Sequence, residues 1–297
     1  MASLTPLENY KDLATAIGCD DVLFKREDLH PYGSHKGRSI PVMIEHYVEA
    51  GDRRFAISSS GNAAFAAGLY VQEYNANASE PVELDIFIGN HIAPHKADKL
   101  KTLADDHIRV IAKERPRQAV LEAEKEGARS LRQSLDDEAL IGYESLGAEI
   151  MSDAKNAGSA VGAIFIGTSS GTTAQALAQY FADKDAGIQV HIVQTSSCHP
   201  MSQEFESYDG PDEQSIADAI VDIVATRKPS LVPAINTTGG HGWTVTNQDI
   251  QNAQEMVFEN TGLEISTNSA LSVAGLITAV EVGWEMPGVP VCLICGD

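Results

Sequence analysis

The sequence predicts an α/β fold with parallel-rich sheets flanked by helices. Short apolar runs of strand length alternate along the chain with longer segments of helical spacing. Several of these runs lead directly into a small polar loop that opens a helix, which is the connection typical of parallel sheets. The chain has 297 residues, enough for one large or two moderate domains.

In the first half of the chain, the predicted strands alternate with predicted helices. The run Arg53–Ile57 ends at a Ser/Gly loop, Val82–Ile88 alternates as a strand does, and Ile108–Ile111 precedes a long charged segment. The helices of this half are predicted from their spacing and their starting residues. They cover residues 7–17, 36–48, 63–74, 94–104 and 115–133.

The second half repeats the alternation. The apolar run Ala160–Ile166 predicts a buried strand, Ile188–Val193 predicts the next, and Val289–Ile294 predicts the last. Helices are predicted at residues 174–181, 215–223, 247–259 and 269–282. The sequence shows neither an internal repeat nor a low-complexity linker.

Composition excludes several classes of protein. A formal charge of −21 argues against nucleic-acid binding, which needs clusters of Lys and Arg. No apolar run reaches membrane-spanning length and the N-terminus lacks a signal pattern, so we expect no membrane association and a cytoplasmic location.

Metal and disulfide sites are not expected either. Four cysteines are too few for a disulfide framework. Cys292 and Cys295 lie three apart in a predicted strand, so they point to opposite faces and do not suggest a zinc or redox site. His91 and His95 are four apart, but without a nearby carboxylate pattern we expect both to be surface residues.

The most informative stretch covers residues 23–38, LFKREDLHPYGSHKGR. His30–Gly33 is expected to turn, and Ser34 to be the N-cap of a helix with Lys36 in its first turn. The positive end of the helix dipole and the charge of Arg38 both disfavour an ammonium group at Lys36, so we expect its amine to lose its proton more easily. A lysine that forms a Schiff base needs such an amine. The alternative is a charged surface turn followed by an ordinary helix.

This stretch resembles the active-lysine segment of fold type II pyridoxal-phosphate (PLP) enzymes. The resemblance rests on Lys25–Leu29, Pro31, Gly33–Ser34, Lys36 and Arg38. It implies that Lys36 forms the Schiff base with PLP. The family includes threonine synthase, threonine dehydratase, cysteine synthase and the tryptophan synthase β chain, and it usually forms dimers.

A Gly/Ser/Thr turn follows the predicted strand 160–166 and matches the family's phosphate loop. Its residues are Gly167, Thr168, Ser169, Ser170, Gly171 and Thr172. Backbone N–H groups at a helix N-terminus suit a phosphate dianion. The turn lacks the lysine of a P-loop and the spacing of a dinucleotide site. A purely structural connector is the alternative.

A second candidate anion site follows the predicted strand 53–57. It consists of Ser59, Ser60, Gly61, Asn62 and Ala63, and we expect it to bind the substrate carboxylate. The resemblance implies that Asn62 also contacts the ring hydroxyl of PLP. A well-capped helix without a ligand is the alternative.

Cys295 resembles the Ser, Thr or Cys that partners the pyridine nitrogen in the family. A neutral partner leaves the ring a weaker electron sink than an aspartate would, which suits elimination and replacement at Cβ. A small buried hydrophobic residue is the alternative. The sequence has only Gly296 and Asp297 after this position, where the family commonly has Gly-Gly-Asn and more chain.

Other positions also depart from the family pattern. His35 replaces the usual aromatic residue, Gly37 replaces a common aspartate, and Ser169 and Ser170 stand where glycines are commoner. His241 and Trp243 in a Gly-rich loop are further candidates without an assigned role.

The resemblance implies two domains. We expect residues 1–45 and 146–297 to form a larger cofactor-binding domain, and residues 46–145 a smaller domain with the substrate loop. The expected reaction is β/γ-elimination or replacement on a small amino acid. The expected enzyme is a carbon-oxygen lyase similar to threonine synthase, acting on O-phosphohomoserine, as Thr5-Pro6-Leu7, Ser60–Ala64 and Ser215–Ile220 suggest. Threonine/serine dehydratase, which Lys25–Leu29 matches as well or better, is the alternative. A non-catalytic PLP-binding module stays open, and a homodimer is expected.

Overall fold

The computed structural model describes residues 4–210 and 213–296 and divides into two compact units. The six-stranded unit comprises Met1–Leu29 and Tyr143–Asp297, and the four-stranded unit comprises His30–Gly142. The expected domains had their boundaries after residues 45 and 145. In the structure, helix α2 (Lys36–Glu49) belongs to the four-stranded unit instead, because Ile40, Met43 and Ile44 are part of its core.

The six-stranded unit has the sheet order β1-β2-β10-β7-β8-β9. The strands are Leu7–Asn9, Leu23–Arg26, Val289–Ile294, Val161–Gly167, Gln189–Thr195 and Gly242–Val245 in that order. All neighbours are parallel except the edge pair β1–β2. The parallel-rich α/β fold predicted from the sequence is therefore confirmed.

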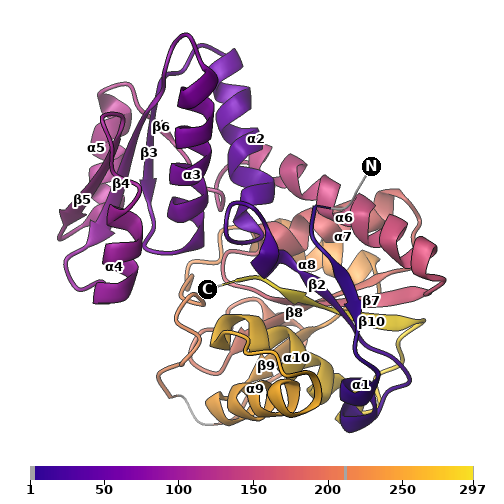
Figure 1. Cartoon of the computed structure of the whole chain (residues 1–297). Helices are drawn as coiled ribbons and strands as arrows, with labels where there is room; N and C mark the ends of the chain where they lie inside the picture. Colours follow the sequence, from indigo (N-terminus) through magenta and orange to yellow (C-terminus); the bar gives the residue numbers. More distant parts are fainter. Residues whose placement is uncertain (1–3, 211–212, 297) are drawn as a thin grey trace. The chain divides into compact units, whose positions relative to one another are not determined.

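Helices cover both faces of this sheet. Helix α10 (Thr267–Glu281) packs on the four strands β7 to β10, and α9 (Asn247–Thr261) packs on α10. Helices α7 (Thr172–Asp183) and α8 (Lys228–Thr237) pack together on the other face (Figure 1). Gly275 permits the close approach of α10, because a Cβ there would lie 2.3 Å from Val193. The short helix α1 (Lys11–Ile17), from the N-terminal part of the chain, packs on α9.

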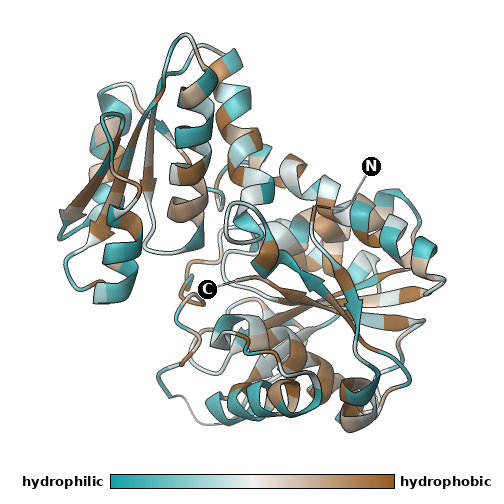
Figure 2. Cartoon of the chain, in the orientation of Figure 1, coloured by the Kyte–Doolittle hydropathy of each residue, from teal (hydrophilic) through white to brown (hydrophobic). Residues whose placement is uncertain are grey.

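The four-stranded unit has the order β5-β4-β3-β6, with all neighbours parallel. These strands are Ile108–Lys113, Glu83–Gly89, Arg54–Ser58 and Arg129–Ser130. Helices α2, α3 (Asn62–Asn77) and α4 (Pro94–Lys101) share one apolar core with the sheet, and α5 (Pro116–Lys125) packs in a second one. In Figure 2 the strands are mostly hydrophobic and the outer faces of the helices mostly hydrophilic, as burial of the sheet requires.

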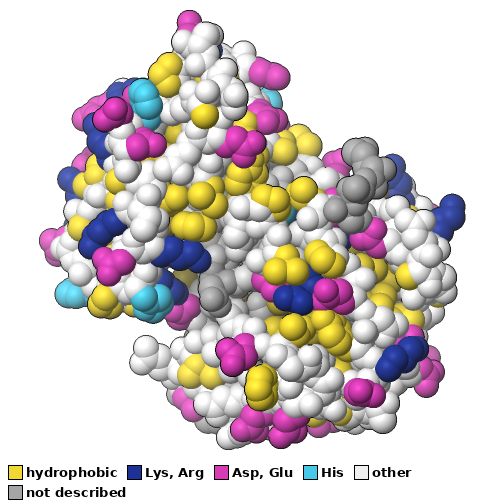
Figure 3. Space-filling view, viewed as in Figure 1, with side chains coloured by type: hydrophobic (Ala, Val, Ile, Leu, Met, Phe, Trp, Pro, Cys, Tyr) yellow, Lys and Arg dark blue, Asp and Glu magenta, His cyan; other side chains and the backbone are white. Residues whose placement is uncertain are grey.

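Charge and hydropathy agree with the composition. Figure 3 shows Asp and Glu side chains spread over the visible face with Lys and Arg among them, rather than gathered in one patch. No helix among the described residues is both long and apolar enough to cross a bilayer.

Four local predictions were wrong. Residues 7–9 form strand β1, because they pair with β2, so the helix starts only at Lys11. The long helix over 115–133 stops at Lys125, because Gly127 turns the chain with φ +91° and β6 then pairs with β3.

Residues 215–223 are irregular rather than helical. Their N–H groups are bound by distant side chains: Ile216 donates to Asn247 and Ala219 donates to Asn268. The N-cap of α2 is His35 rather than Ser34. Helices α6 (Glu138–Ala157) and α8 and strand β9 had no counterpart in the prediction, and the division between the units falls inside α6.

Candidate functional site

Both candidate anion loops follow a strand at a topological switch point. In the six-stranded sheet, β7 lies between β8, its successor in the chain, and β10, the last strand. In the four-stranded sheet, β3 lies between its successor β4 and the later strand β6. In open α/β sheets, ligands bind outside the carboxyl ends of strands at such points. The loops 167–172 and 59–63 therefore occupy the equivalent position in their respective units.

The turn Gly167–Thr172 requires glycine at both ends. A Cβ on Gly167 would lie 2.9 Å from the carbonyl oxygen of Asn268. Gly171 is the N-cap of α7 with φ +83°, and a Cβ there would lie 2.9 Å from Leu231. These close approaches fix the path of the turn around the N-terminus of α7, whose first N–H groups have no partner inside the helix.

Some hydrogen-bond donors of this turn bind the protein backbone, and others lie at the start of α7, where a ligand could accept from them. The N–H of Thr168 donates to the Val193 carbonyl at 2.8 Å, and its hydroxyl donates to the Ile166 carbonyl at 2.8 Å. Thr168 therefore holds the turn to the sheet. The hydroxyls of Ser170 and Thr172 lie 3.0 Å apart at the start of α7. With the helix N-terminus they form a donor set that fits a phosphate dianion.

Ser169 connects the turn to the irregular segment 215–223 through one hydrogen bond. Its hydroxyl accepts the N–H of Val221 at 3.2 Å, which leaves the hydroxyl proton available for another acceptor. The same segment is bound to the start of α10, because Asn268 accepts the N–H of Ala219 and its amide donates to Asp218. The serines at positions where glycines are commoner thus have a structural use.

Cys295 lies at the same sheet edge as the turn, directly after β10. Strands β10 and β7 are parallel neighbours, with Cys292 opposite Phe165. The backbone N–H of Cys295 donates to the Ser269 hydroxyl at 3.1 Å, and its buried thiol donates to the Leu293 carbonyl at 3.7 Å. Ser269 is a supporting residue that the sequence reasoning missed, although the N-cap Ser266 three residues earlier signals that helix start.

Cys292 points elsewhere, as the alternation along a strand requires. Its thiol donates to the Ser272 carbonyl at 3.6 Å on α10, and burial raises the pKa of this thiol far above its ordinary value. The two cysteines of the C-x-x-C therefore contact different neighbours. Within the described part of the chain, no three His, Cys, Asp or Glu side chains are grouped as a metal site.

In the four-stranded unit, Lys36 is the first residue of α2 and is half-buried. Its N–H donates to the Ser34 hydroxyl at 3.3 Å, so Ser34 still supports the helix start from one position before the N-cap. The His30 ring lies against Gly37, where a Cβ would be 2.3 Å from the ring. The glycine at a position where aspartate is common therefore makes room for His30.

The loop after β3 has the form of an anion site. Gly61 is the N-cap of α3 without a side-chain cap, and Asn62 is the first helical residue. The Ser59 hydroxyl accepts the N–H of Gly61 at 3.3 Å, which curls the loop. A Cβ on Gly61 would meet nothing within 4 Å, so there is open space over the helix N-terminus. Ser60 is exposed and Ala63 is half-buried.

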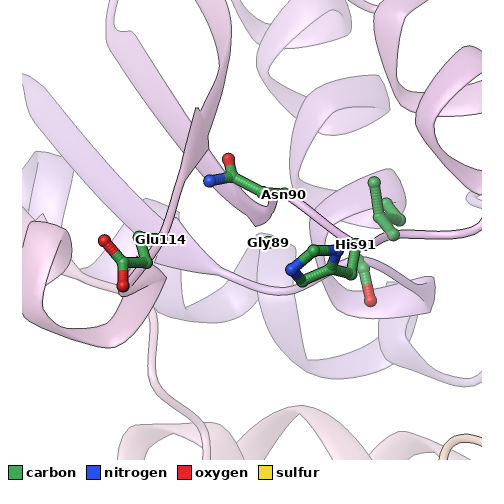
Figure 4. A pocket seen from close by; sticks show the side chains of 6 residues that line it. Gly89, Asn90, His91 and Glu114 are labelled. Atoms are coloured by element: carbon green, nitrogen blue, oxygen red, sulfur yellow. The ribbon is translucent and has the colours of Figure 1, made fainter.

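A pocket adjoins Ser60 at this edge of the four-stranded unit. It has a volume of about 270 Å³ and is lined by Ser60, Gly89, Asn90, His91, Ile92 and Glu114 (Figure 4). His91 is exposed, as expected, but it faces this pocket. The pocket was not foreseen, because it combines loops from three strands whose order in the sheet is not written in the sequence.

The charges of Lys25–Asp28 serve the fold of the six-stranded unit. Lys25 is fully buried, and its ammonium group lies 3.1 Å from Glu149 and 3.0 Å from Asp153. Glu27 is also buried and accepts the hydroxyl of Thr5 at 2.6 Å. These residues anchor β2 to α6 and to the N-terminal segment, so this part of the motif positions the chain rather than a ligand.

His241 and Trp243 belong to an aromatic cluster. The His241 ring lies 4.6 Å from Trp243 and 4.7 Å from Trp284, and the Trp243 indole donates to His191 at 3.2 Å. Burial, with a smaller effect from His241, lowers the pKa of His191 to about 3, and burial also lowers the pKa of His241. Since His191 lies near the start of β8 and the turn 167–172 lies at the opposite ends of the strands, the cluster contributes packing to this unit.

The chain was compared with known proteins. The model of the family described as pyridoxal-phosphate dependent enzyme matches residues 2–296. Threonine synthase from Methanosarcina acetivorans is 26% identical over 94% of this chain and 70% of its own. Threonine synthase from Mycobacterium leprae is 25% identical over 99% of this chain and 81% of its own.

Solved structures show the same fold. A pyridoxal 5'-phosphate-dependent aspartate racemase has a TM-score of 0.83 at 18% identity, covering 99% of this chain and 90% of its own. The processed form of threonine deaminase isoform 2 from Solanum lycopersicum has a TM-score of 0.79 at 20% identity, covering 99% and 79%. The resemblance to fold type II and the cofactor it implied are confirmed. The chain belongs to the family of pyridoxal-phosphate dependent enzymes.

Proposed function

We propose that this protein eliminates or replaces a β or γ substituent of a small amino acid, with Lys36 as the catalytic residue. The observation that carries the proposal is the turn 167–172 at the switch point of the six-stranded sheet. Its helix N-terminus and paired hydroxyls form a phosphate site in a chain of this family. Gly167, Thr168, Ser169, Ser170, Gly171 and Thr172 are the residues proposed to surround the cofactor phosphate.

Lys36 has two tasks in this proposal. Its Nζ atom would hold the cofactor through the aldehyde carbon, with loss of water, and the same amine, once released, would take the proton from Cα of the amino acid. PLP, when bound, supplies the electron withdrawal that makes this proton acidic.

The loop Ser59, Ser60, Gly61, Asn62 and Ala63 is proposed to bind the substrate carboxylate. The N-terminus of α3 favours a negative charge, and the open space over Gly61 admits one. Asn62 is proposed to contact the cofactor as well. An amino acid held there has its orientation fixed at the end opposite to the leaving group.

Cys295 is proposed to face the pyridine nitrogen. Its thiol is neutral and weakly hydrogen-bonding, and its backbone is fixed by Ser269. A ring nitrogen beside a neutral partner would withdraw electrons less strongly than a protonated ring nitrogen, which favours loss of a β or γ substituent over other outcomes.

Two reactions compete as the physiological one. The two curated relatives are both threonine synthases, which supports a synthase acting on O-phosphohomoserine. The pocket beside Ser60 carries a carboxylate, Glu114, which supports a threonine/serine dehydratase acting on an unphosphorylated substrate. Phosphate release with threonine formation would identify the synthase, and ammonia release with a 2-oxo acid the dehydratase.

A non-catalytic PLP-binding module is the third candidate, supported by the departures at Gly37, Ser169 and Ser170.

We also propose a cytoplasmic homodimer that acts on a small amino acid. Light scattering of the purified protein tests the dimer, since a mass of one chain would contradict it.

The visible absorption spectrum tests the proposal directly. Wild-type protein supplied with PLP should show the band of lysine-bound cofactor, Lys36→Ala should lose it, and L-serine or L-threonine should shift it in the wild type. Lys99→Ala is a matched control, because this exposed lysine of α4 lies over the Phe65 ring of α3 and is not among the residues proposed to bind the cofactor. No band after addition of PLP would refute the proposal, and a band without turnover on any amino acid would identify the non-catalytic module.

A further inference from the structure

The pocket beside Ser60 lies wholly within the four-stranded unit, where three loops meet. Strands β3, β4 and β5 are parallel neighbours, so the loops after them lie at one edge of the sheet. Ser60 comes from the first loop, Asn90 and His91 from the second, and Glu114 from the third. Since Ser60 also belongs to the proposed carboxylate loop, a molecule held by that loop has the pocket next to it.

The pocket has room for a small side chain. Its volume is about 270 Å³, and a Cβ built on Gly89 would meet nothing within 4 Å. A water molecule occupies about 30 Å³ of liquid, so the space exceeds what one or two solvent molecules need. The end of strand β4 therefore leaves open a volume that a single larger residue would fill.

The polar groups of the pocket have a definite chemistry. Glu114 contributes a carboxylate, whereas Ser60 and Asn90 contribute neutral groups that both donate and accept hydrogen bonds. In Figure 4 the Asn90 amide is directed toward the side on which Glu114 lies. A hydroxyl or an amine can donate to the carboxylate, while a phosphate dianion meets it as a like charge.

The helix ends at this edge do not reverse that preference. Helices α3, α4 and α5 all begin here, and their N-termini favour anions. The N-terminus of α3 is proposed to take the substrate carboxylate. Glu114 lies one residue before the N-cap Arg115 of α5 and already supplies the negative charge that this helix end favours.

We propose that this pocket receives the side-chain end of the amino-acid substrate and selects an unphosphorylated group that donates a hydrogen bond. The proposal rests on the proposed function, because it takes residues 59–63 as the carboxylate site. Glu114 is the specificity-determining residue, and the preferred substrate class is hydroxy amino acids rather than their phosphate esters. The pocket thereby favours the dehydratase over the synthase.

Titration of the visible spectrum with L-homoserine and O-phospho-L-homoserine tests the proposal, since the two ligands differ only in the phosphate. Wild-type protein should bind L-homoserine at least about tenfold more tightly, and Glu114→Lys should shift the ratio toward the phosphate ester by about tenfold or more. Glu124→Lys makes the same change of charge on an exposed site of α5 and should leave the ratio unchanged.

A second variant separates volume from charge. Gly89→Val should fill the pocket and weaken L-homoserine binding about tenfold, with little effect on L-alanine, whose side chain ends at Cβ. A cofactor band that shifts with amino acids but keeps the same ratio in Glu114→Lys would overturn the pocket proposal alone. Tighter wild-type binding of the phosphate ester would do the same. Absence of the band in every variant would overturn the proposed function as well.

Discussion

The substitution Gly37→Ala tests how the start of α2 is built. A Cβ on this residue would lie 2.3 Å from both Cε1 and Nδ1 of His30, and 2.8 Å from Cβ of Tyr32. The ring cannot turn aside freely, because it is buried and its Nδ1 atom accepts the N–H of Tyr32 at 3.1 Å. The methyl group must therefore displace the His30 ring or shift the first turn of the helix.

The expected magnitude follows from opposing contributions. Alanine in place of glycine stabilises a helix by up to about 1 kcal/mol. Overpacking of a buried site costs about 1–3 kcal/mol, and loss of the His30–Tyr32 hydrogen bond costs about 1 kcal/mol more. We expect Gly37→Ala to lower the free energy of unfolding by about 1–3 kcal/mol. In a His30→Ala background, where the ring is absent, that cost should fall by at least about 1 kcal/mol.

Urea denaturation of the wild type, both single variants and the double variant gives the coupling energy. Far-UV circular dichroism reports both units, whereas both tryptophans, Trp243 and Trp284, lie in the six-stranded unit. The urea midpoint reported by tryptophan fluorescence therefore serves as a control, because it follows the six-stranded unit and should change little in these variants. An equal cost of Gly37→Ala in both backgrounds, within about 0.5 kcal/mol, would show that the His30 ring is not the reason for the glycine.

Three further substitutions have defined outcomes. Gly171→Ala, at φ +83° and close to Leu231, should destabilise the protein by about 1–3 kcal/mol and weaken PLP binding at least about tenfold, measured by cofactor titration; unchanged affinity would contradict the fitted turn. Lys25→Met should cost about 2–4 kcal/mol in urea denaturation, because two carboxylates lose their buried partner; a neutral effect would contradict the anchoring role. The pKa of His191 is lowered to about 3 in the folded chain and is about 6.5 when unfolded, so stability is lost as pH falls below 6.5, by up to about 1.4 kcal/mol per pH unit. His191→Gln should remove this part of the slope, and an unchanged slope would refute the assignment.

The local form of the candidate site can be predicted from the sequence, because its two loops are local patterns. A short apolar strand followed by a Ser/Gly/Thr turn and a helix fixes the form of loops 59–63 and 167–172 without reference to the rest of the chain. The position of Lys36 at the start of a helix is equally local, although the N-cap lies one residue later than expected. The ends of strands and helices were therefore predicted well where neighbours in sequence determine them.

The failures lie where distant residues decide the structure. Residues 215–223 contain enough helix-forming residues to suggest a helix, but Asn247 and Asn268 bind their N–H groups in an irregular path. Strand β6 has two residues and exists only because β3 provides a partner. The pocket beside Ser60 and the support of Cys295 by Ser269 depend on strand order, which a single sequence does not state.

The position of β10 has a consequence for how the protein is made. This strand follows every other element in chain order, yet it lies between β2 and β7 within the six-stranded sheet. The four-stranded unit is continuous in sequence, so it can fold while synthesis proceeds. Until β10 has been synthesised, β1 and β2 cannot join the larger sheet, because β10 is the strand that connects β2 to it. The β2–β10 pairing joins residues far apart in the chain. The arrival of β10 closes the sheet and places Cys295 in the same event, so the proposed cofactor site can be complete only when this unit is complete.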